Sequence, residues 1–494
     1  MIDVLSVSEM RERENRLFSS GVSEWELMEL AVSAIAPYID NTKKTLFVCG
    51  KGNNAGDALG VCYKLKTQNA SVEVALIYDE LKPCAVRYLE TCRSVGVKVM
   101  RADECDFSRY EQIVDGIFGI GFHGDLPAEA ENVIKRINQS GKFVISIDVP
   151  SGLNGDNGTC EYAVKADVTI AVGALKTGLI LNRAKDFVGK KIVADIGIES
   201  NSAVKLAEEC DFTEILAERE NFVHKGKYGY VGIMGGSKNY SGAVKLANLS
   251  LSQLRAGAGV SRLIVPDCIS HAVTPYLTVS TLFSLPDNGE HIIFDEERLK
   301  KSLENLCSLA FGMGMTDNVD TAEIIKYILK NYTLKLMIDA DGLNALSPFV
   351  ESLKNTRCKV VITPHVKEFS RLTGINTQRI LSDPVNYARS FAREYGVIVL
   401  LKGTATVVTD GTETVLVDRG SPAMATAGSG DVLDGIISGI MGYNDISVRS
   451  VACGAFLNGL SGEFSERKNS AISAIATDTL TEIAEAVKFL CNNK

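Results

Sequence analysis

The sequence predicts an α/β protein of two domains, each with three layers in which helices cover both faces of a mainly parallel sheet. Short apolar runs typical of buried strands alternate with helical stretches along the chain, which favours parallel strands joined by crossover helices. Several of these runs end in polar, glycine-rich loops that lead into a helix, the order in which doubly wound folds bind phosphates. The length of 494 residues is enough for two or three domains.

The first half opens with a helix that begins at Ser23, where Ser23 and Glu26 have the spacing of a capping box, and that ends near Pro37. Further helices are expected over 83–95 and 128–140. Strands are expected at 45–49, 72–78, 97–100, 112–115, 143–148 and 168–172.

Three glycine-rich loops follow strands of this sheet, at 50–60, 115–125 and 148–155. Because ligands gather at the carboxyl ends of parallel strands, these loops should surround one crevice. A single aspartate at a strand end is often only a cap, but three such loops in one sheet are hard to explain in that way. The side-chain oxygens of Asn53 and Asn54 could bind a monovalent cation or ribose hydroxyls; alternatively, the two residues only occupy turn positions.

The joint between the halves, 202–221, is expected to be helical and charged, without a sheet pattern. We place the domain boundary there, which gives domains 1–214 and 215–494. Beyond it Ser241-Gly242-Ala243 precedes a helix expected to run to about Ala256, and strands are expected at 230–234, 260–265, 308–311, 336–339, 359–363, 397–401, 404–409 and 412–417. The last two strands flank Asp410-Gly411, which indicates a two-residue hairpin turn.

The loop 427–431 carries the main chemistry of the second half. Its glycines let backbone N–H groups turn inward, and the helix that follows presents unpaired N–H groups and the positive end of its dipole. Such a helix start binds phosphate, and Asp431 can accept a proton from a hydroxyl. An ordinary capped helix with Asp in its first turn is the plain alternative. His365 is expected to contact a ligand, whereas Lys402 is either a phosphate contact or a solvated strand end.

Composition describes a soluble globular protein, with 46% hydrophobic and 23% charged residues. The net charge of −9 argues against nucleic acid as a partner. We find no apolar run of about 18 residues that would suggest a membrane span, and no apolar secretion signal. The twelve cysteines form no CxxC pair and the five histidines lie far apart, which argues against a zinc site and for reduced thiols in the cytoplasm.

The loops of the first half carry the motifs GNNAGDAL, DGIFGIGFHGDL and DVPSGLNGDNG, followed by ADVTIAVGALKTGLIL. In this order, over roughly the first 210 residues, they resemble the NAD(P)H-hydrate epimerase family. The resemblance implies a Rossmann-like domain that interconverts the R and S epimers of hydrated NADH and NADPH with a bound potassium ion. Ala55 and Ala58 stand where that family usually has glycine.

This resemblance also implies roles for single residues. The potassium ion would be held by Asn54, Asp115 and Ser151. Asp148 would be the catalytic acid/base, with His123 as a helper. The hydrated nicotinamide would contact Asp148 and residues of two loops, namely Asn53, Asn54, Ala55, Gly56, Asp57, Gly119, Ile120, Gly121, Phe122, His123, Gly124 and Asp125.

The second half carries HKGKYG, GGSKNYSGA, IDADGLNAL, TPHVKEFSRL, LKGTATVV and AGSGDVLDGIISG in order. Together they resemble the NAD(P)H-hydrate dehydratases of the ribokinase-like superfamily, in which a Gly-x-Gly-Asp loop forms the anion hole and its Asp is the base. Departures are mild: Ser429 replaces the usual Thr, and Val366-Lys367 replaces Pro-Gly after His365.

By this resemblance, Asp431 would take the proton from the C6 hydroxyl of the S epimer, which then attacks the terminal phosphoryl of ADP. The ring nitrogen would expel the phosphate, restoring NADH or NADPH, with AMP and phosphate as co-products and Mg²⁺ assisting. The hydrated cofactor would contact Ala243, Gly312, Gly314, His365 and Asp431. ADP would contact Lys402, Gly403, Thr404, Ala405, Thr406 and Gly430.

The whole chain is therefore expected to be a bifunctional isomerase and lyase, with an N-terminal Rossmann-like three-layer sandwich and a C-terminal ribokinase-like three-layer α/β/α domain. Its partners would be hydrated NADH and NADPH and ADP, with K⁺ in the first domain and Mg²⁺ in the second. We expect a cytoplasmic homo-oligomer. Two alternatives stay open: a vitamin or sugar kinase with an accessory domain, which would release a stable phosphorylated product, and a first half that only binds nucleotide or serves in assembly.

Overall fold

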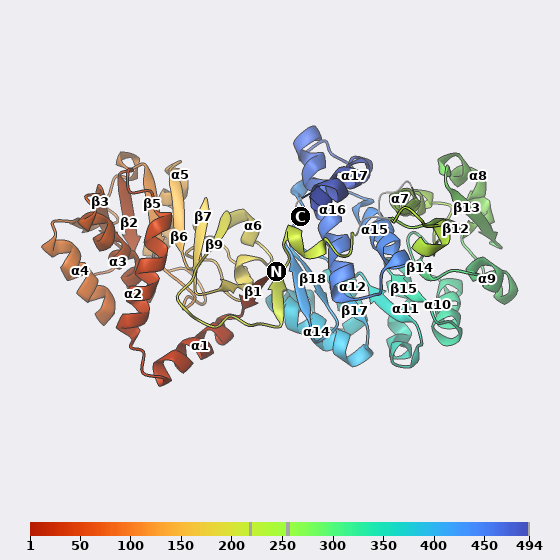
Figure 1. Cartoon of the computed structure of the whole chain (residues 1–494), viewed down its shortest axis with the longest axis horizontal. Helices are drawn as coiled ribbons and strands as arrows, with labels where there is room; N and C mark the ends of the chain where they lie inside the picture. The colour runs from red at the N-terminus through yellow and green to blue at the C-terminus, as the bar shows by residue number, and fades with distance from the viewer. Residues whose placement is uncertain (217–219, 253–256, 493–494) are drawn as a thin grey trace. The chain divides into compact units, whose positions relative to one another are not determined.

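The chain folds into two compact units in the computed structural model, Ile2–Ser202 and Ala203–Lys494, with Met1 grouped with the second. The structure describes residues 1–216, 220–252 and 257–492. Each unit is an α/β fold in which helices flank a mainly parallel sheet (Figure 1). The predicted fold class is confirmed.

The main sheet of the first unit is parallel and follows the order β4-β3-β2-β5-β6-β7-β9. Strand order reverses between β2 and β5, so the loops after these two strands open on the crevice where such folds bind ligands. Outside this order, β1 (Ile2–Leu5) pairs in parallel with β8 (Leu175–Lys176). The strands of the main sheet are β2 (Thr45–Cys49), β3 (Val72–Leu76), β4 (Lys98–Arg101), β5 (Gln112–Gly116), β6 (Phe143–Ile147), β7 (Val168–Val172) and β9 (Lys190–Ala194).

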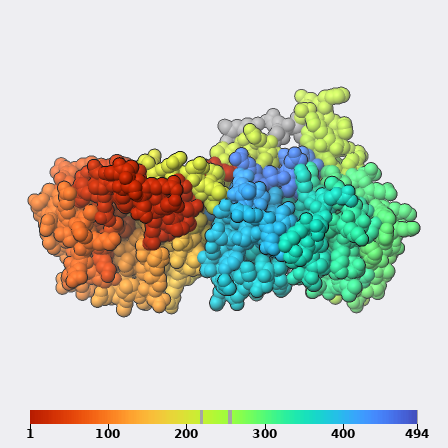
Figure 2. Space-filling view, turned by 90° about the horizontal axis from the view of Figure 1, so that it is seen from below, coloured from red at the N-terminus to blue at the C-terminus, as the bar shows by residue number. Residues whose placement is uncertain are grey.

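Helices cover both faces of this sheet because successive residues of a strand point to opposite sides. In β2, Phe47 and Cys49 pack with α2, α3 and α4, whereas Leu46 and Val48 pack with α5. The capping box at Ser23 is confirmed at the start of α2. Figure 2 shows the first residues of the chain, in dark red, on the surface of this unit. The helices are α1 (Val7–Ser19), α2 (Glu24–Ile35), α3 (Asn53–Thr67), α4 (Pro83–Ser94), α5 (Ala128–Gln139) and α6 (Ala184–Phe187).

The strands of the second unit follow the order β13-β12-β11-β14-β15-β16-β17-β18-β19-β10. Strands β13 to β17 are parallel, and β18 is antiparallel to both of its neighbours. Strand order reverses between β11 and β14. The strands are β10 (Val204–Leu206), β11 (Tyr230–Met234), β12 (Val260–Pro266), β13 (Ser280–Leu285), β14 (Ser308–Phe311), β15 (Lys335–Ile338), β16 (Lys359–Ile362), β17 (Ile398–Leu401), β18 (Thr406–Thr409) and β19 (Thr414–Val417).

One large apolar cluster joins this sheet to α7, α15, α16 and α17, with Ile233, Met337 and Leu400 from the strands and Ile436 from α15 at its centre. On β17 and β18, α14 packs as well. The helices are α7 (Ser241–Ser252), α8 (Ser270–Val273), α9 (Glu296–Leu303), α10 (Val319–Asn331), α11 (Asp341–Leu346), α12 (Val366–Thr373), α13 (Thr377–Ser382), α14 (Pro384–Tyr395), α15 (Ser429–Tyr443), α16 (Val448–Asn469) and α17 (Ala476–Asn492). Within the described ranges, no helix combines the length and apolar character that crossing a bilayer demands.

The structure corrects the predicted joint between the halves. The stretch 202–221, expected to lack a sheet pattern, contains β10, which pairs with β19. A three-residue strand that forms by pairing with distant parts of the chain leaves no local periodicity to detect. The compact units accordingly divide after Ser202, ahead of the boundary we placed after residue 214. Residues 217–219 of this stretch lie outside the described residues.

Other differences concern short elements. Sequence patterns did not reveal β1, β8, β9 or β13. The hairpin of β18 and β19 is confirmed, but its loop has four residues and not two, because Thr409 pairs with Thr414. The helix predicted to follow Ala243 already begins at Ser241 and is described as far as Ser252, and 253–256 lie outside the described residues.

Candidate active sites

A cavity of about 750 Å³ opens at the carboxyl ends of the first sheet. The start of α3, the loop after β5, the end of β6 and residues of α1 form its wall. Gly124, which was also predicted for this site, lines a neighbouring cavity of about 390 Å³. The larger cavity brings together ten of the residues predicted for this site: Asn53, Asn54, Asp57, Gly119, Ile120, Gly121, Phe122, His123, Asp125 and Asp148.

An ion pair with a fully buried lysine holds Asp148 in the cavity wall. Lys176 Nζ lies 2.6 Å from Asp148 Oδ1 and also donates to the Val172 carbonyl oxygen at 2.6 Å. The backbone N–H of Ile120 donates to Asp148 Oδ2 at 3.0 Å. Asp148 has a φ of +67°, a left-handed conformation that non-glycine residues adopt at a cost and that clusters at functional sites. The two contacts to Asp148 therefore fix the direction of its carboxylate.

Two further carboxyls line the same cavity. Burial, followed by the negative charges of Asp148 and Glu14, raises the pKa of Asp57 well above its ordinary value, against the opposing effect of Lys176. Burial and the charge of Asp148 likewise raise the pKa of Glu14 on α1. Two carboxyls with raised pKa values thus face the Asp148–Lys176 ion pair, an arrangement that can provide both a proton donor and a proton acceptor.

The predicted potassium ligands lie together beneath this cavity. Asn54 donates through Nδ2 to the carbonyl oxygens of Phe118 at 2.8 Å and Ile147 at 3.1 Å, whereas its buried Oδ1 has no hydrogen-bond partner among the described residues. Ser151 Oγ donates to the fully buried Asp115 at 2.6 Å. An unpaired buried amide oxygen beside a buried carboxylate fits a cation that prefers oxygen ligands.

Asp115 itself is already saturated with hydrogen bonds. Its two oxygens accept from the Ser151 Oγ and N–H groups, from Ser146 Oγ and from the Ile117 N–H. Burial raises the pKa of Asp115, and these hydrogen bonds oppose the rise. Since four donors use the lone pairs of a carboxylate, Asp115 would act on a cation mainly through its charge and through the orientation of Ser151.

His123 lies at the exposed mouth of the cavity. Its Nε2 is 3.3 Å from Nη2 of Arg11, and Arg11 also lines the cavity. An exposed ring that accepts a hydrogen bond from an arginine can contact a substrate, but no contact joins it to Asp148.

The two alanines that replace family glycines do not narrow the cavity. Ala55 and Ala58 are fully buried, and neither belongs to the described residues that line it. Ala58 packs against the backbone of Gly116, where an added Cβ would come within 2.4 Å of the Ala58 Cβ. Gly56 faces Met28 on α2 in the same way. The contacts of Ala55 and Gly56 with the nicotinamide therefore stay predictions. Only backbone atoms of these two residues could make them.

In the second unit, α15 begins without a side-chain cap. Gly428 precedes it with a φ of +96°, and no side chain caps the helix. The Ser429 N–H donates to the Thr426 carbonyl oxygen at 3.4 Å, and the Val432 N–H donates to the Gly428 carbonyl oxygen at 3.1 Å. Among the described residues, nothing accepts from the N–H groups of Gly430 and Asp431. These groups are free to bind an anion.

Asp431 lies at this helix start beside a buried ion pair. Asp339, at the end of β15, contacts Lys402 Nζ through both carboxylate oxygens, at 2.8 and 3.0 Å. Burial, followed by the charge of Asp339, raises the pKa of Asp431 to about 7, although Lys402 acts in the opposite direction. A carboxyl that titrates near neutral pH is well suited to accept a proton as a general base.

The predicted ADP-binding segment meets the same helix start. A Cβ added to Gly430 would lie 3.8 Å from Lys402 Nζ. Burial opposes the charge of Lys402, but neighbouring carboxylates, above all Asp339, raise its pKa above the ordinary value. Lys402 is thus a permanent cation inside the site and not a solvated strand end. From the end of β17 to the start of β18 the segment comprises Lys402, Gly403, Thr404, Ala405 and Thr406.

The loop after β14 reaches both the ion pair and α7. Gly312 and Gly314 have φ values of +122° and +66°. A Cβ at Gly312 would lie 2.1 Å from the Asp339 carbonyl oxygen, and one at Gly314 would lie 3.3 Å from the Ala243 Cβ and 2.8 Å from the Tyr240 Cβ. Only glycine permits this approach. The structure therefore brings Ala243, Gly312 and Gly314 close to one another, as predicted for the hydrate site.

His365 caps α12 and lies beside Lys402. Its Nδ1 accepts from the N–H groups of Lys367 at 3.1 Å and Glu368 at 3.2 Å, and its backbone bridges to Lys402. Burial and the charge of Lys402 lower the pKa of His365. The ring is therefore neutral at pH 7, with its proton on Nε2, from which it can donate to a ligand.

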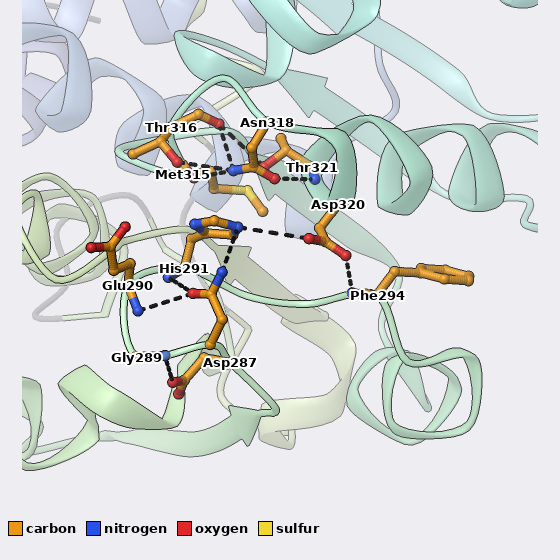
Figure 3. Close-up of polar contacts among 11 residues, drawn as sticks. Asp287, Gly289, Glu290, His291, Phe294, Met315, Thr316, Asn318, Asp320 and Thr321 are labelled. Atoms are coloured by element: carbon orange, nitrogen blue, oxygen red, sulfur yellow. Dashed lines mark hydrogen bonds and ion pairs between the residues drawn. The ribbon is translucent and has the colours of Figure 1, made fainter.

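A separate polar cluster joins residues 287–294 to Asp320 at the start of α10 (Figure 3). The Lys238 N–H donates to the Glu290 carbonyl oxygen at 2.8 Å. His291 Nε2 lies 3.1 Å from Asn288 Nδ2 and 3.6 Å from Asp320 Oδ2, and Figure 3 shows the ring pointing toward Asp320. These contacts tie residues 287–294 to the start of α10. We assign them a supporting role, because they do not reach Asp431.

Sequence reasoning missed four ionisable residues of these sites: Glu14, Lys176, Asp339 as the partner of Lys402, and the fully buried Asp434. Lys176 and Asp434 stand within the quoted motifs, and Asp339 closes an apolar strand, so each carried a weak signal. Their pairing depends on strands far apart in sequence.

Comparisons with known proteins agree with this two-site arrangement. A family model described as NAD(P)H-hydrate dehydratase matches residues 231–485, and a model described as YjeF-related protein N-terminus matches residues 24–178. A bifunctional NAD(P)H-hydrate repair enzyme of Moorella thermoacetica is 33% identical over 463 residues, which cover 89% of this chain and 86% of that protein. Its counterpart in Archaeoglobus fulgidus is 32% identical over 502 residues, 98% of this chain and 99% of that protein.

Solved structures share the fold of the second unit. An ADP/ATP-dependent NAD(P)H-hydrate dehydratase from Bacillus subtilis, co-crystallised with ATP/Mg²⁺, matches with a TM-score of 0.51 and 23% identity, over 58% of this chain and 99% of that chain. A ribokinase-like superfamily protein from Enterococcus faecalis matches with a TM-score of 0.52 and 20% identity, over 59% and 97%.

Proposed function

We infer that this chain, which belongs to the family of bifunctional NAD(P)H-hydrate repair enzymes, repairs hydrated NADH and NADPH with one active site in each unit. The first unit epimerises the R and S hydrates, and the second dehydrates the S hydrate with ADP. Together they return either epimer to the reduced cofactor.

One observation carries the dehydratase proposal: Asp431, with a pKa of about 7, stands beside unpaired N–H groups at the start of α15. Asp431 accepts the proton of the C6 hydroxyl as the hydroxyl oxygen attacks the terminal phosphoryl of ADP and AMP leaves. The N–H groups of Gly430 and Asp431, with Lys402, hold the negative charge of the transferring group. The ring nitrogen then expels phosphate from C6 and a proton leaves C5, which restores the dihydropyridine ring.

In the epimerase site, we propose that Asp57 or Glu14 supplies a proton to the C6 hydroxyl, which leaves as water while the ring nitrogen donates its electron pair to C6. Water then adds to the opposite face of C6, and Asp148, oriented by Lys176, accepts the proton that this water loses. The raised pKa values of Asp57 and Glu14 next to an ion pair support this division of labour. His123, at the cavity mouth, would contact the substrate and assist.

For potassium, we propose Asn54 Oδ1 and Ser151 Oγ as ligands, with Asp115 as the neighbouring charge. The unpartnered buried oxygen of Asn54 supports this assignment. When bound, the ion would supply positive charge beneath the substrate. Mg²⁺ would arrive with the nucleotide and neutralise phosphate charge during transfer. The homo-oligomeric state and the cytoplasmic location stay predictions.

The test uses each hydrate epimer separately, with ADP and Mg²⁺, and follows recovery of the near-ultraviolet absorbance of reduced nicotinamide. Asp431→Asn should abolish repair of both epimers while R and S still interconvert. Asp148→Asn should abolish repair of the R epimer and leave that of the S epimer. Loss of both activities in Asp431→Asn would mean that the two sites are not independent, and a stable phosphorylated product would favour the kinase alternative.

A further inference from the structure

Asp434 is a buried acidic side chain that receives no hydrogen bond from the described residues. It lies on α15 one turn after Asp431 and is 0% exposed. Neither of its two oxygens accepts a hydrogen bond from a donor group among the described residues. A buried charge left without a partner is strongly unfavourable, so a group in this position either finds a counter-ion or gives up its charge.

The neighbour of Asp434 is another acid. The Asp339 carboxylate lies within hydrogen-bonding reach of Asp434, and both of its oxygens already contact Lys402 Nζ. Two adjacent carboxylates do not both ionise readily, because their charges repel at low dielectric. Asp339 keeps its charge since Lys402 pairs with it. The proton of the pair therefore resides on Asp434.

We propose that Asp434 is a neutral carboxylic acid in the working enzyme, donates its proton as a hydrogen bond to Asp339, and so acts as a positioning residue for the Asp339–Lys402 pair. This inference deepens the proposed dehydratase function and rests on it for the role of Lys402. It differs from the assignment of Asp431, which must lose its proton to act. Two aspartates three residues apart on one helix thus work in opposite protonation states.

The surrounding charges support this assignment. The groups that face Asp434 are Asp339 after β15, Lys402 after β17 and Asp431 on its own helix. Burial, then the charge of Asp339, raises the pKa of Asp434 well above the ordinary value, and Lys402 opposes this only in part. A neutral Asp434 also spares Asp431 a second negative neighbour, which would make its proton harder to release.

The positioning effect follows from the hydrogen bond to Asp339. With the proton of Asp434 on one side and Lys402 on the other, the Asp339 carboxylate has a single favourable orientation. Lys402 Nζ is then held near Gly430, where the proposed phosphate site lies. Without the donor, Asp339 can turn, and Lys402 loses its fixed place.

The test compares Asp434→Asn with Asp434→Ala in the full chain. Asn has nearly the shape of Asp and keeps an N–H donor toward Asp339, whereas Ala removes it. Loss of a hydrogen bond to a charged group should raise the KM for ADP about tenfold or more in Asp434→Ala. In Asp434→Asn, the KM and the kcat should lie within about threefold of the wild-type values. The pH profile of dehydration should match that of the wild type. A purely space-filling role would make a volume-matched Asp434→Leu as good as Asn.

A second readout does not depend on turnover. Infrared difference spectra at pH 8 should contain the carbonyl band of a protonated carboxylic acid that Asp434→Asn removes and Asp431→Asn retains. Absence of that band, or a loss of dehydration in a folded Asp434→Asn variant comparable to that in Asp431→Asn, would overturn the proposal. If Asp434→Asn does not fold, Asp434→Leu supplies the reference spectrum, because other carboxyls with raised pKa values absorb in the same region. If the second unit were not a dehydratase, the carbonyl band of Asp434 would still be present. Only the expected differences in KM between the Asp434 variants would be missing.

Discussion

Replacing Asp431 by Asn should stabilise the second unit at neutral and alkaline pH, even though it removes the proposed base. Burial and the charge of Asp339 raise the pKa of Asp431 from the ordinary 3.8 to about 7. The folded unit therefore binds this proton more tightly than the unfolded chain does. Below pH 3.8 both states carry the proton and the carboxyl costs nothing. Above that pH the folded state loses stability steadily, until the pH passes the folded pKa and the cost reaches a plateau.

The size of the effect follows from the two pKa values of Asp431. A difference of about 3 units, at about 1.36 kcal/mol each, gives a gain of up to about 4 kcal/mol for Asp431→Asn at pH 8. At pH 5, only about one of these pKa units contributes to the difference in unfolding free energy. The gain for Asp431→Asn therefore falls to about 2 kcal/mol. For a unit of this size, about 2 °C per kcal/mol translates these gains into about 8 °C and about 4 °C.

Thermal unfolding of the wild type and Asp431→Asn at pH 5 and pH 8 measures this difference in the transition of the second unit. Asp317→Asn is the matched control, because Asp317 is exposed. Its loss of one negative charge should produce no gain that grows with pH. An Asp431→Asn variant that melts at or below the wild-type temperature at pH 8, or one whose gain is equal at both pH values, would refute the reasoning.

Three further predictions concern the sites themselves. The kcat/KM for the S hydrate should rise roughly tenfold between pH 6 and pH 8 as Asp431 ionises. Asp339→Asn removes a negative neighbour of Asp431 and should move the midpoint of this rise to lower pH. An unmoved midpoint would contradict this. Lys176→Met should abolish repair of the R hydrate and spare repair of the S hydrate. It should also lower the unfolding free energy of the first unit by about 3–5 kcal/mol, and with it the melting temperature, since it leaves Asp148 buried without its ion-pair partner. Asn54→Ala should make epimer exchange insensitive to replacing K⁺ by Li⁺, and persistent sensitivity would remove Asn54 from the ion site.

Much of the fold could be predicted because the buried strands carry their own signal. The runs at 45–49, 168–172, 230–234 and 308–311 reappear with the same bounds as β2, β7, β11 and β14. Their continuous apolar character reflects burial on both faces of a parallel sheet. Glycine-rich loops after such strands marked the ligand sides of both sheets for the same reason, since the carboxyl ends of parallel strands share an edge.

The remaining features depend on partners that no local pattern contains. Strand β10 is only three residues long and forms through β19, more than two hundred residues later in the chain. Lys176 looked like a lysine at the end of an apolar run, yet it is fully buried because Asp148 reaches it from another strand. Protonation states follow the same rule, because burial and neighbouring charges set them and both are tertiary properties.

The two sites use one electrostatic device on different scaffolds. In each, a lysine pairs with a buried carboxylate at the end of a strand, Lys176 with Asp148 at 2.6 Å and Lys402 with Asp339 at 2.8 Å. Burial, followed by the charge of that carboxylate, raises the pKa of a neighbouring carboxyl, Asp57 in the first unit and Asp431 in the second. A carboxyl with a raised pKa keeps its proton at a pH at which a solvated aspartate has lost it. Because both reactions act on the same hydroxyl of the same damaged ring, similar proton chemistry in two unrelated pockets is what their shared substrate demands.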